Sequence, residues 1–155
     1  MRSPIELDDG PLPERVQEWA AGKATLKELR GYTADELYAI ARSAHVFYRQ
    51  GRIEPARVLF HGLRGVDPLD PYFARAVAVV EFAAGNREAA LLAWNAAVAL
   101  DPVDASAWVG RAEVRIASGD GAEAISDLRR AQAIAATDHP LRAKIDALLH
   151  LLKLR

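Results

Sequence analysis

The sequence contains no cysteine, which excludes disulfides, thiolate metal sites and cysteine nucleophiles. It also lacks a surplus of charge of either sign, because 20 lysines and arginines are set against 21 aspartates and glutamates. Phosphate-driven binding of nucleic acid needs a basic surplus or a basic stripe. We therefore expect neither a protein of an oxidising compartment nor a nucleic-acid-binding protein.

Long apolar runs are missing as well. The longest, from Ala89 to Leu100, is about a dozen residues and contains Asn95, whereas a membrane-spanning helix needs roughly 20. The start of the chain carries acidic residues where a signal peptide needs basic residues followed by an apolar run. The composition, 51% hydrophobic and 26% charged, still supports a packed core. The expectation is a soluble, cytoplasmic bacterial protein with no membrane contact.

Common catalytic motifs are absent too. The sequence has no Gly-x-x-x-x-Gly-Lys-Ser/Thr loop to hold phosphates, no Gly-x-Ser-x-Gly and no His-Glu-x-x-His. The histidines show no spacing typical of metal ligands. We expect no enzyme activity, no metal and no cofactor.

What the sequence does contain is a repeat with a period of 34 residues. This period, with its landmarks, resembles the tetratricopeptide repeat, a helix-turn-helix unit. Each recurring glycine suits the left-handed end of a first helix, and each Asp-Pro pair suits the end of a second helix. The landmarks are Gly51, Gly85 and Gly119; Asp67-Pro68 and Asp101-Pro102; Ala56, Ala90 and Ala124; and Phe60, Trp94 and Leu128.

The repeat predicts an all-α fold, a solenoid of three tetratricopeptide repeats. Thr33 begins a capping box, and Asp70 and Asp104 precede helices that they can cap. The alanines let the two helices of a unit approach closely, and Phe60 and Trp94 fill the gap to the following unit. The predicted units are residues 37–70, 71–104 and 105–138.

The flanks of the repeats differ in character from the repeats themselves. We expect a disordered leader over residues 1–13 and short N-terminal helices within residues 14–36. Residues 139–155 are expected to form a C-terminal helix that caps the last repeat, because apolar residues recur there on one helical face. That face comprises Ile145, Leu148, Leu149 and Leu152.

In stacked units of this kind the first helices line the concave side. The inward positions, assigned by resemblance to the repeat family, suit an extended and partly apolar peptide. For Val79 and Phe82 a core position is an equally good interpretation. His45 is interpreted as a packing or hydrogen-bonding residue, and Arg57 as a solvated one. The predicted groove residues are Tyr38, Ala41, His45, Tyr48, Tyr72, Arg75, Val79, Phe82 and Val109.

One well-known function of such repeats can be tested on the sequence. Repeat domains that bind the acidic C-termini of heat-shock chaperones hold the carboxylates with lysine, asparagine and arginine. The matching positions here have none of these residue types, so that function is excluded. They are Ala41, His45, Ala76, Ser106 and Gly110.

The chain also resembles a particular family, the class II chaperones of bacterial type III secretion (the SycD/LcrH kind), over roughly residues 22 to 153. The resemblance rests on the approach Gly22-Lys-Ala-Thr-Leu-Lys-Glu-Leu29, the first unit from Leu37 to Phe60, Tyr72-Phe73, and the stretch from Glu123 to Gln132. It implies a cytoplasmic chaperone that holds hydrophobic translocator subunits before export, with a translocator segment in the concave groove. A generic tetratricopeptide scaffold that joins two proteins is the alternative.

The same resemblance implies a possible homodimer formed through the N-terminal helices. For Trp19, packing against the first unit is an equally good interpretation. The predicted contact residues are Val16, Trp19, Leu26 and Leu29.

Overall fold

A computed structural model describes residues 14–153, all of whose regular elements are helices. The leader predicted over residues 1–13 lies outside the described residues. The helices are α1 (Glu14–Ala20), α2 (Leu26–Arg30), α3 (Ala34–Arg49), α4 (Ile53–Val66), α5 (Pro71–Ala83), α6 (Arg87–Leu100), α7 (Ala105–Ser118), α8 (Gly121–Ile134) and α9 (Arg142–Lys153). None of them is long and apolar enough to cross a membrane.

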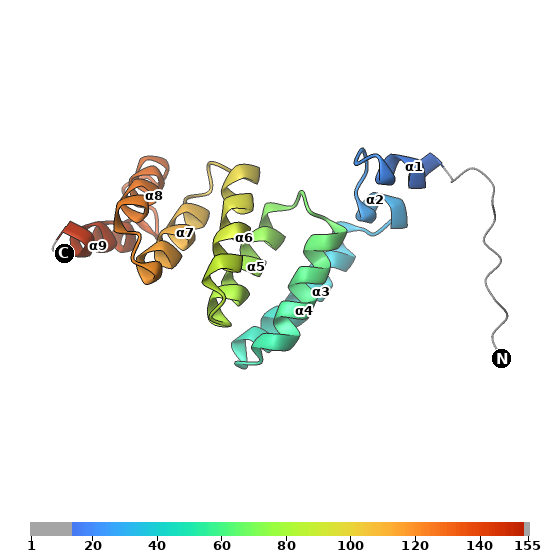
Figure 1. Cartoon of the computed structure of the whole chain (residues 1–155), viewed down its shortest axis with the longest axis horizontal. Coiled ribbons are helices and arrows are strands. Elements are labelled where there is room, and N and C mark those ends of the chain that lie inside the picture. The colour runs from blue at the N-terminus through green and yellow to red at the C-terminus, as the bar shows by residue number, and fades with distance from the viewer. Residues whose placement is uncertain (1–13, 154–155) are drawn as a thin grey trace.

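The helices from α3 to α8 form three hairpins that stack in a single row (Figure 1). Each hairpin packs its second helix against the first helix of the next, α4 on α5 and α6 on α7, and α9 packs on α8. The short pair α1 and α2 lies at the opposite end of the row, where α2 contacts α4 (Figure 1). The prediction of an all-α repeat solenoid is confirmed.

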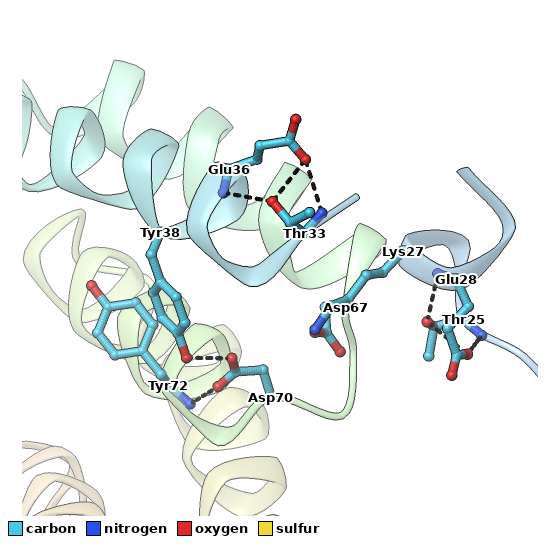
Figure 2. Close-up of polar contacts among 9 residues, drawn as sticks. All are labelled: Thr25, Lys27, Glu28, Thr33, Glu36, Tyr38, Asp67, Asp70 and Tyr72. Carbon is cyan, nitrogen blue, oxygen red and sulfur yellow. Dashed lines mark hydrogen bonds and ion pairs between the residues drawn. The ribbon is translucent and has the colours of Figure 1, made fainter. Parts of the chain in front are cut away.

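The first helix of each hairpin begins at a side-chain cap. Thr33 and Glu36 form the expected capping box, in which the Thr33 N–H donates to Glu36 Oε2 at 2.8 Å (Figure 2). Asp70 and Asp104 each accept a backbone N–H two residues on, at 2.9 Å, and so cap α5 and α7. Gly119 follows α7 with φ +88°, a left-handed conformation that glycine adopts without steric cost.

Alanines form the contacts within each hairpin. Because an alanine side chain is a single methyl group, two helix backbones can approach closely wherever alanines face each other. Larger buried side chains such as Phe60 and Phe73 fill the space between hairpins, and Leu128 packs in the cluster that includes Ile145 and Leu149 of α9. The alanines without exposed surface include Ala44 and Ala56, Ala78 and Ala90, and Ala112 and Ala124.

The carboxylates of Asp67, Glu81 and Asp127 are buried with their partners. Glu81 on α5 is 2% exposed and accepts hydrogen bonds from Arg57 Nε at 3.0 Å and Asn86 Nδ2 at 2.7 Å. His61 Nε2 lies 2.5 Å from the same carboxylate. The interpretation of Arg57 as a solvated residue is therefore wrong: its guanidinium links the first hairpin to the second. A sequence pattern could not reveal this because the two charges lie 24 positions apart.

The ends of the row are attached by different means. At the N-terminal end, Lys27 Nζ on α2 donates to Asp67 Oδ2, at the end of α4, over 2.7 Å (Figure 2). At the C-terminal end, α9 buries Ile145 and Leu149 against the last hairpin. The contact at the C-terminal end is thus mainly apolar, and α9 covers the side of α8 that no further repeat would cover.

Candidate functional site

Most of the predicted groove residues meet at one pocket between the hairpins. The pocket has a volume of about 280 Å³ and takes residues from α3 to α7. Its walls are mostly aromatic and aliphatic. The lining residues are His45, Tyr48, Phe60, Tyr72, Arg75, Ala76, Val79, Val80, Trp94 and Ser106.

A second pocket of about 230 Å³ continues from the first toward α7. Tyr48, Val79 and Trp94 line both pockets, so the two form one surface, which we call the groove. The second pocket adds Phe82, Ala83, Gly110 and Glu113.

The structure decides between core and groove for Val79 and Phe82. Their exposed fractions are 36% and 37%, and both side chains line the groove. A buried core position is therefore wrong for these two residues.

Two predicted groove residues are buried instead. Ala41 is 1% exposed and Val109 is 3% exposed, and each belongs to a packed core cluster. Ala41 is too short to reach past the larger side chains around it, and Val109 packs in the cluster beneath α9. Neither residue lines the groove, so both predictions are corrected.

Tyr38 lies behind the groove, where it supports Tyr72. Its hydroxyl donates to Asp70 Oδ2 at 2.6 Å, and its ring meets the Tyr72 ring edge-on with centroids 5.4 Å apart (Figure 2). The hydrogen bond to the carboxylate raises the pKa of Tyr38 to about 12. Tyr38 therefore stays a neutral donor and acts on the groove only through Tyr72.

Four polar side chains of the groove are already paired: His45 with Tyr72, and Arg75 with Asp104 and Ser106. His45 Nε2 and the Tyr72 hydroxyl lie 2.5 Å apart in a hydrogen bond, which agrees with the hydrogen-bonding role expected of His45. Burial raises the pKa of Tyr72, so its phenol is also neutral. Arg75 Nη1 donates to Asp104 Oδ2 and Ser106 Oγ, each at 2.8 Å, and so joins α5 to the third hairpin.

Sequence reasoning missed the residues that the second helices contribute. Phe60 on α4 and Trp94 on α6 were expected to fill the gaps between units, and they also form the apolar floor of the groove. The repeat pattern assigns inward positions to first helices alone, so it leaves these two rings out. Ala76, Val80 and Gly110 were missed because small or aliphatic residues at helical spacing are typical of any core.

The four residues predicted for a dimer contact lie at the N-terminal end. Trp19 is 46% exposed, while Val16, Leu26 and Leu29 are half-buried. Trp19 and Leu26 line a pocket of about 380 Å³ together with Pro68 and Leu69 from the turn after α4. The exposed indole leaves an apolar surface at this end of the row.

No protein-family model and no curated protein matches the sequence. Solved structures do match. The Yersinia enterocolitica type III secretion chaperone SycD, in complex with a peptide of the translocator YopD, superposes with a TM-score of 0.74 at 24% identity, over 79% of this chain and 95% of that one. A T3SS complex from Aeromonas hydrophila superposes with a TM-score of 0.82 at 20% identity, over 92% and 97% of the two chains.

A third match comes from outside type III secretion. The first tetratricopeptide domain of Spaghetti (RPAP3), bound to an HSP90 peptide, has a TM-score of 0.72 at 20% identity, over 79% of this chain and 94% of that one. At these identities the likeness establishes a shared backbone arrangement. The chain therefore has the tetratricopeptide-repeat fold that type III secretion chaperones such as SycD also have.

Proposed function

We propose that the chain is a cytoplasmic chaperone of type III secretion that binds hydrophobic translocator proteins in its groove. The observation that carries the proposal is the groove itself, an apolar surface formed where three hairpins meet and lined by Tyr48, Tyr72, Val79 and Trp94. A surface of this composition suits an extended segment with apolar side chains. The likeness to SycD, which is bound to a translocator peptide, supports the same use.

The chaperone acts by covering apolar surface. A translocator must enter a membrane later, so before export it exposes large apolar patches, and such patches aggregate in water. A segment held along the groove exchanges its contact with water for contact with aromatic rings. No covalent chemistry is needed, and the paired state of Arg75 and His45 leaves the apolar walls as the main binding surface.

The N-terminal helices are proposed to form a homodimer contact. The exposed Trp19 and the half-buried Leu26 present apolar surface away from the groove. Two chains could therefore associate at this end while each groove stays open to a client.

The alternative function is a generic scaffold that joins two proteins. The likeness to an HSP90-binding repeat domain favours a peptide-binding role of that wider kind. The polar residues for gripping a terminal carboxylate are missing, however: His45, Ala76 and Ser106 occupy the positions where such domains carry lysine or asparagine. Gene neighbourhood separates the alternatives, because the chaperone needs secretion genes nearby.

Co-expression with the neighbouring translocator genes tests the proposal. We expect a translocator that is insoluble alone to become soluble and to purify together with this chain. A matched co-expression with a chain carrying Phe82→Glu should return the translocator to the insoluble fraction. If the translocators stay insoluble with and without the chain, the chaperone function is wrong.

A further inference from the structure

The floor of the groove depends on a close contact between Trp94 on α6 and Gly110 on α7. A Cβ atom placed on Gly110 would overlap the six-membered ring of Trp94 at Cζ2, Cη2 and Cε2. The indole therefore occupies the space that any other residue at position 110 would fill. Trp94 is only 6% exposed, yet it lines both pockets of the groove.

The preceding repeat has a smaller ring and a larger small residue at the matching positions. Phe60 and Ala76 lie 34 positions before Trp94 and Gly110, and both line the first pocket. The phenyl ring is thus accompanied by an alanine, whereas the larger indole is accompanied by a glycine. Ring size and the size of the accompanying residue vary inversely, as expected of closely packed surfaces.

The pocket above this floor is large enough for an aromatic ring. Its volume is about 280 Å³, and an apolar cavity of roughly 150 Å³ already holds benzene. Four of its walls are the rings of Tyr48, Phe60, Tyr72 and Trp94. Ring edges and faces attract a further ring beyond what area burial provides.

The imidazole of His45 and the guanidinium of Arg75, at the wall of the pocket, are already bonded within the protein. Among the described residues, no buried side-chain nitrogen or oxygen lacks a partner. At the pocket itself, His45 is bonded to Tyr72, and Arg75 to Asp104 and Ser106. An apolar anchor is therefore favoured over a polar one, because it leaves every existing hydrogen bond in place.

We infer that the first pocket selects an aromatic side chain of the bound segment, and that the Trp94–Gly110 contact sets its depth. The inference rests on the groove being the binding surface proposed above. Alanine at position 110 forces the indole out of its place. The ring then moves toward the open pockets, since the rest of its surroundings is packed core.

Titration of the full chain with N-acetyl-phenylalanine amide and N-acetyl-leucine amide, followed by NMR, tests the inference. We expect the phenylalanine probe to bind at least fivefold more tightly than the leucine probe. Gly110→Ala should weaken binding of the phenylalanine probe at least tenfold and should shift the Trp94 indole N–H resonance. Gly62→Ala is the matched control, because a Cβ on this α4 glycine meets nothing within 4 Å.

A second variant keeps the test decisive if Gly110→Ala fails to fold. Trp94→Leu deepens the pocket. The affinity of N-acetyl-tryptophan amide, relative to that of the phenylalanine probe, should therefore rise at least threefold in this variant. Equal binding of the phenylalanine and leucine probes would overturn the inference, as would unchanged binding in both variants. These probes contain no translocator sequence, so a chain that shows the aromatic preference but captures no translocator contradicts the proposed function alone.

Discussion

Arg57 on α4 donates its Nε hydrogen to the buried carboxylate of Glu81 on α5 over 3.0 Å, and this bond joins the first hairpin to the second. The same guanidinium reaches Glu54, on its own helix, at 2.9 Å. One arginine thus has a buried partner in the next repeat and an exposed partner in its own. Comparing the two glutamates separates the effect of burial on stability from the effect of charge.

Removal of the buried partner should destabilise the fold more than removal of the exposed one. Glu81→Ala removes the acceptor of Asn86 Nδ2 and of Arg57 Nε, which keeps only Glu54, and a buried donor left unsatisfied costs about 1–3 kcal/mol. Glu54→Ala should cost less than about 1 kcal/mol, as is usual for an exposed pair. Urea denaturation of both variants measures the difference. Equal losses would show that the junction does not depend on Glu81.

The same carboxylate should make stability depend on pH. Burial alone would raise the pKa of Glu81, but hydrogen bonds from Asn86, His61 and Arg57 outweigh it and hold the pKa below its ordinary 4.5. The stability it contributes is therefore fully present above pH 4.5 and is lost as the pH falls through the lower, folded-state pKa. The difference in unfolding free energy between wild type and Glu81→Gln should shrink from pH 7 to pH 3. A constant difference would contradict this assignment.

The floor of the groove should also be a stability element. Phe60 is 1% exposed, and truncation to alanine should cost about 3–5 kcal/mol because it leaves a cavity between hairpins. Val58→Ala, on the same helix with an exposed side chain, should change the unfolding free energy by less than about 0.5 kcal/mol. Thermal and urea denaturation of the two variants provide the comparison. A small loss for Phe60→Ala would mean that the rings of the groove floor are not packed as described.

The ends of the helices could be predicted from the landmarks of the repeat. Glycine at the end of a helix, aspartate before a helix and an Asp-Pro pair each act locally, so Gly119, Asp70 and Asp101 could be assigned to helix ends without a structure. Burial is not local. Ala41 and Val109 were placed in the groove because their repeat positions face inward, but neighbouring side chains cover them.

The sequence predicts only those residues of the site that the repeat pattern places on first helices. His45, Tyr48, Tyr72 and Arg75 lie on first helices at positions that the repeat pattern assigns, and they line the groove. Trp94 comes from a second helix and reaches the groove through the space left by Gly110. That space depends on how two hairpins are oriented, which a periodic sequence does not encode directly.

The proposed dimer contact can be tested without altering the groove. Trp19→Glu places a charge on the exposed apolar surface at the N-terminal end, so it should convert a dimer into a monomer. Light scattering measures the mass, and circular dichroism should show an unchanged helical melt. A wild-type chain that is monomeric at all concentrations would contradict the dimer.

Binding should respond to charge in the groove and not on the outer helices. Phe82→Glu introduces a carboxylate beside the second pocket and should weaken binding of a translocator segment at least tenfold. Val58→Glu is the matched control, because Val58 is exposed on α4 and lines neither pocket. Fluorescence anisotropy of a labelled translocator segment gives the two affinities. Similar losses in both variants would indicate binding outside the groove.

Site-specific photo-crosslinking in the proposed complex with a translocator tests most directly whether the groove holds the client. A benzoylphenylalanine at Val79 lies in the groove, and one at Leu92 lies on the exposed side of α6. The account predicts that irradiation joins the translocator to position 79 and leaves position 92 unlinked. A crosslink at position 92 with none at position 79 would contradict the claim that the groove holds the client.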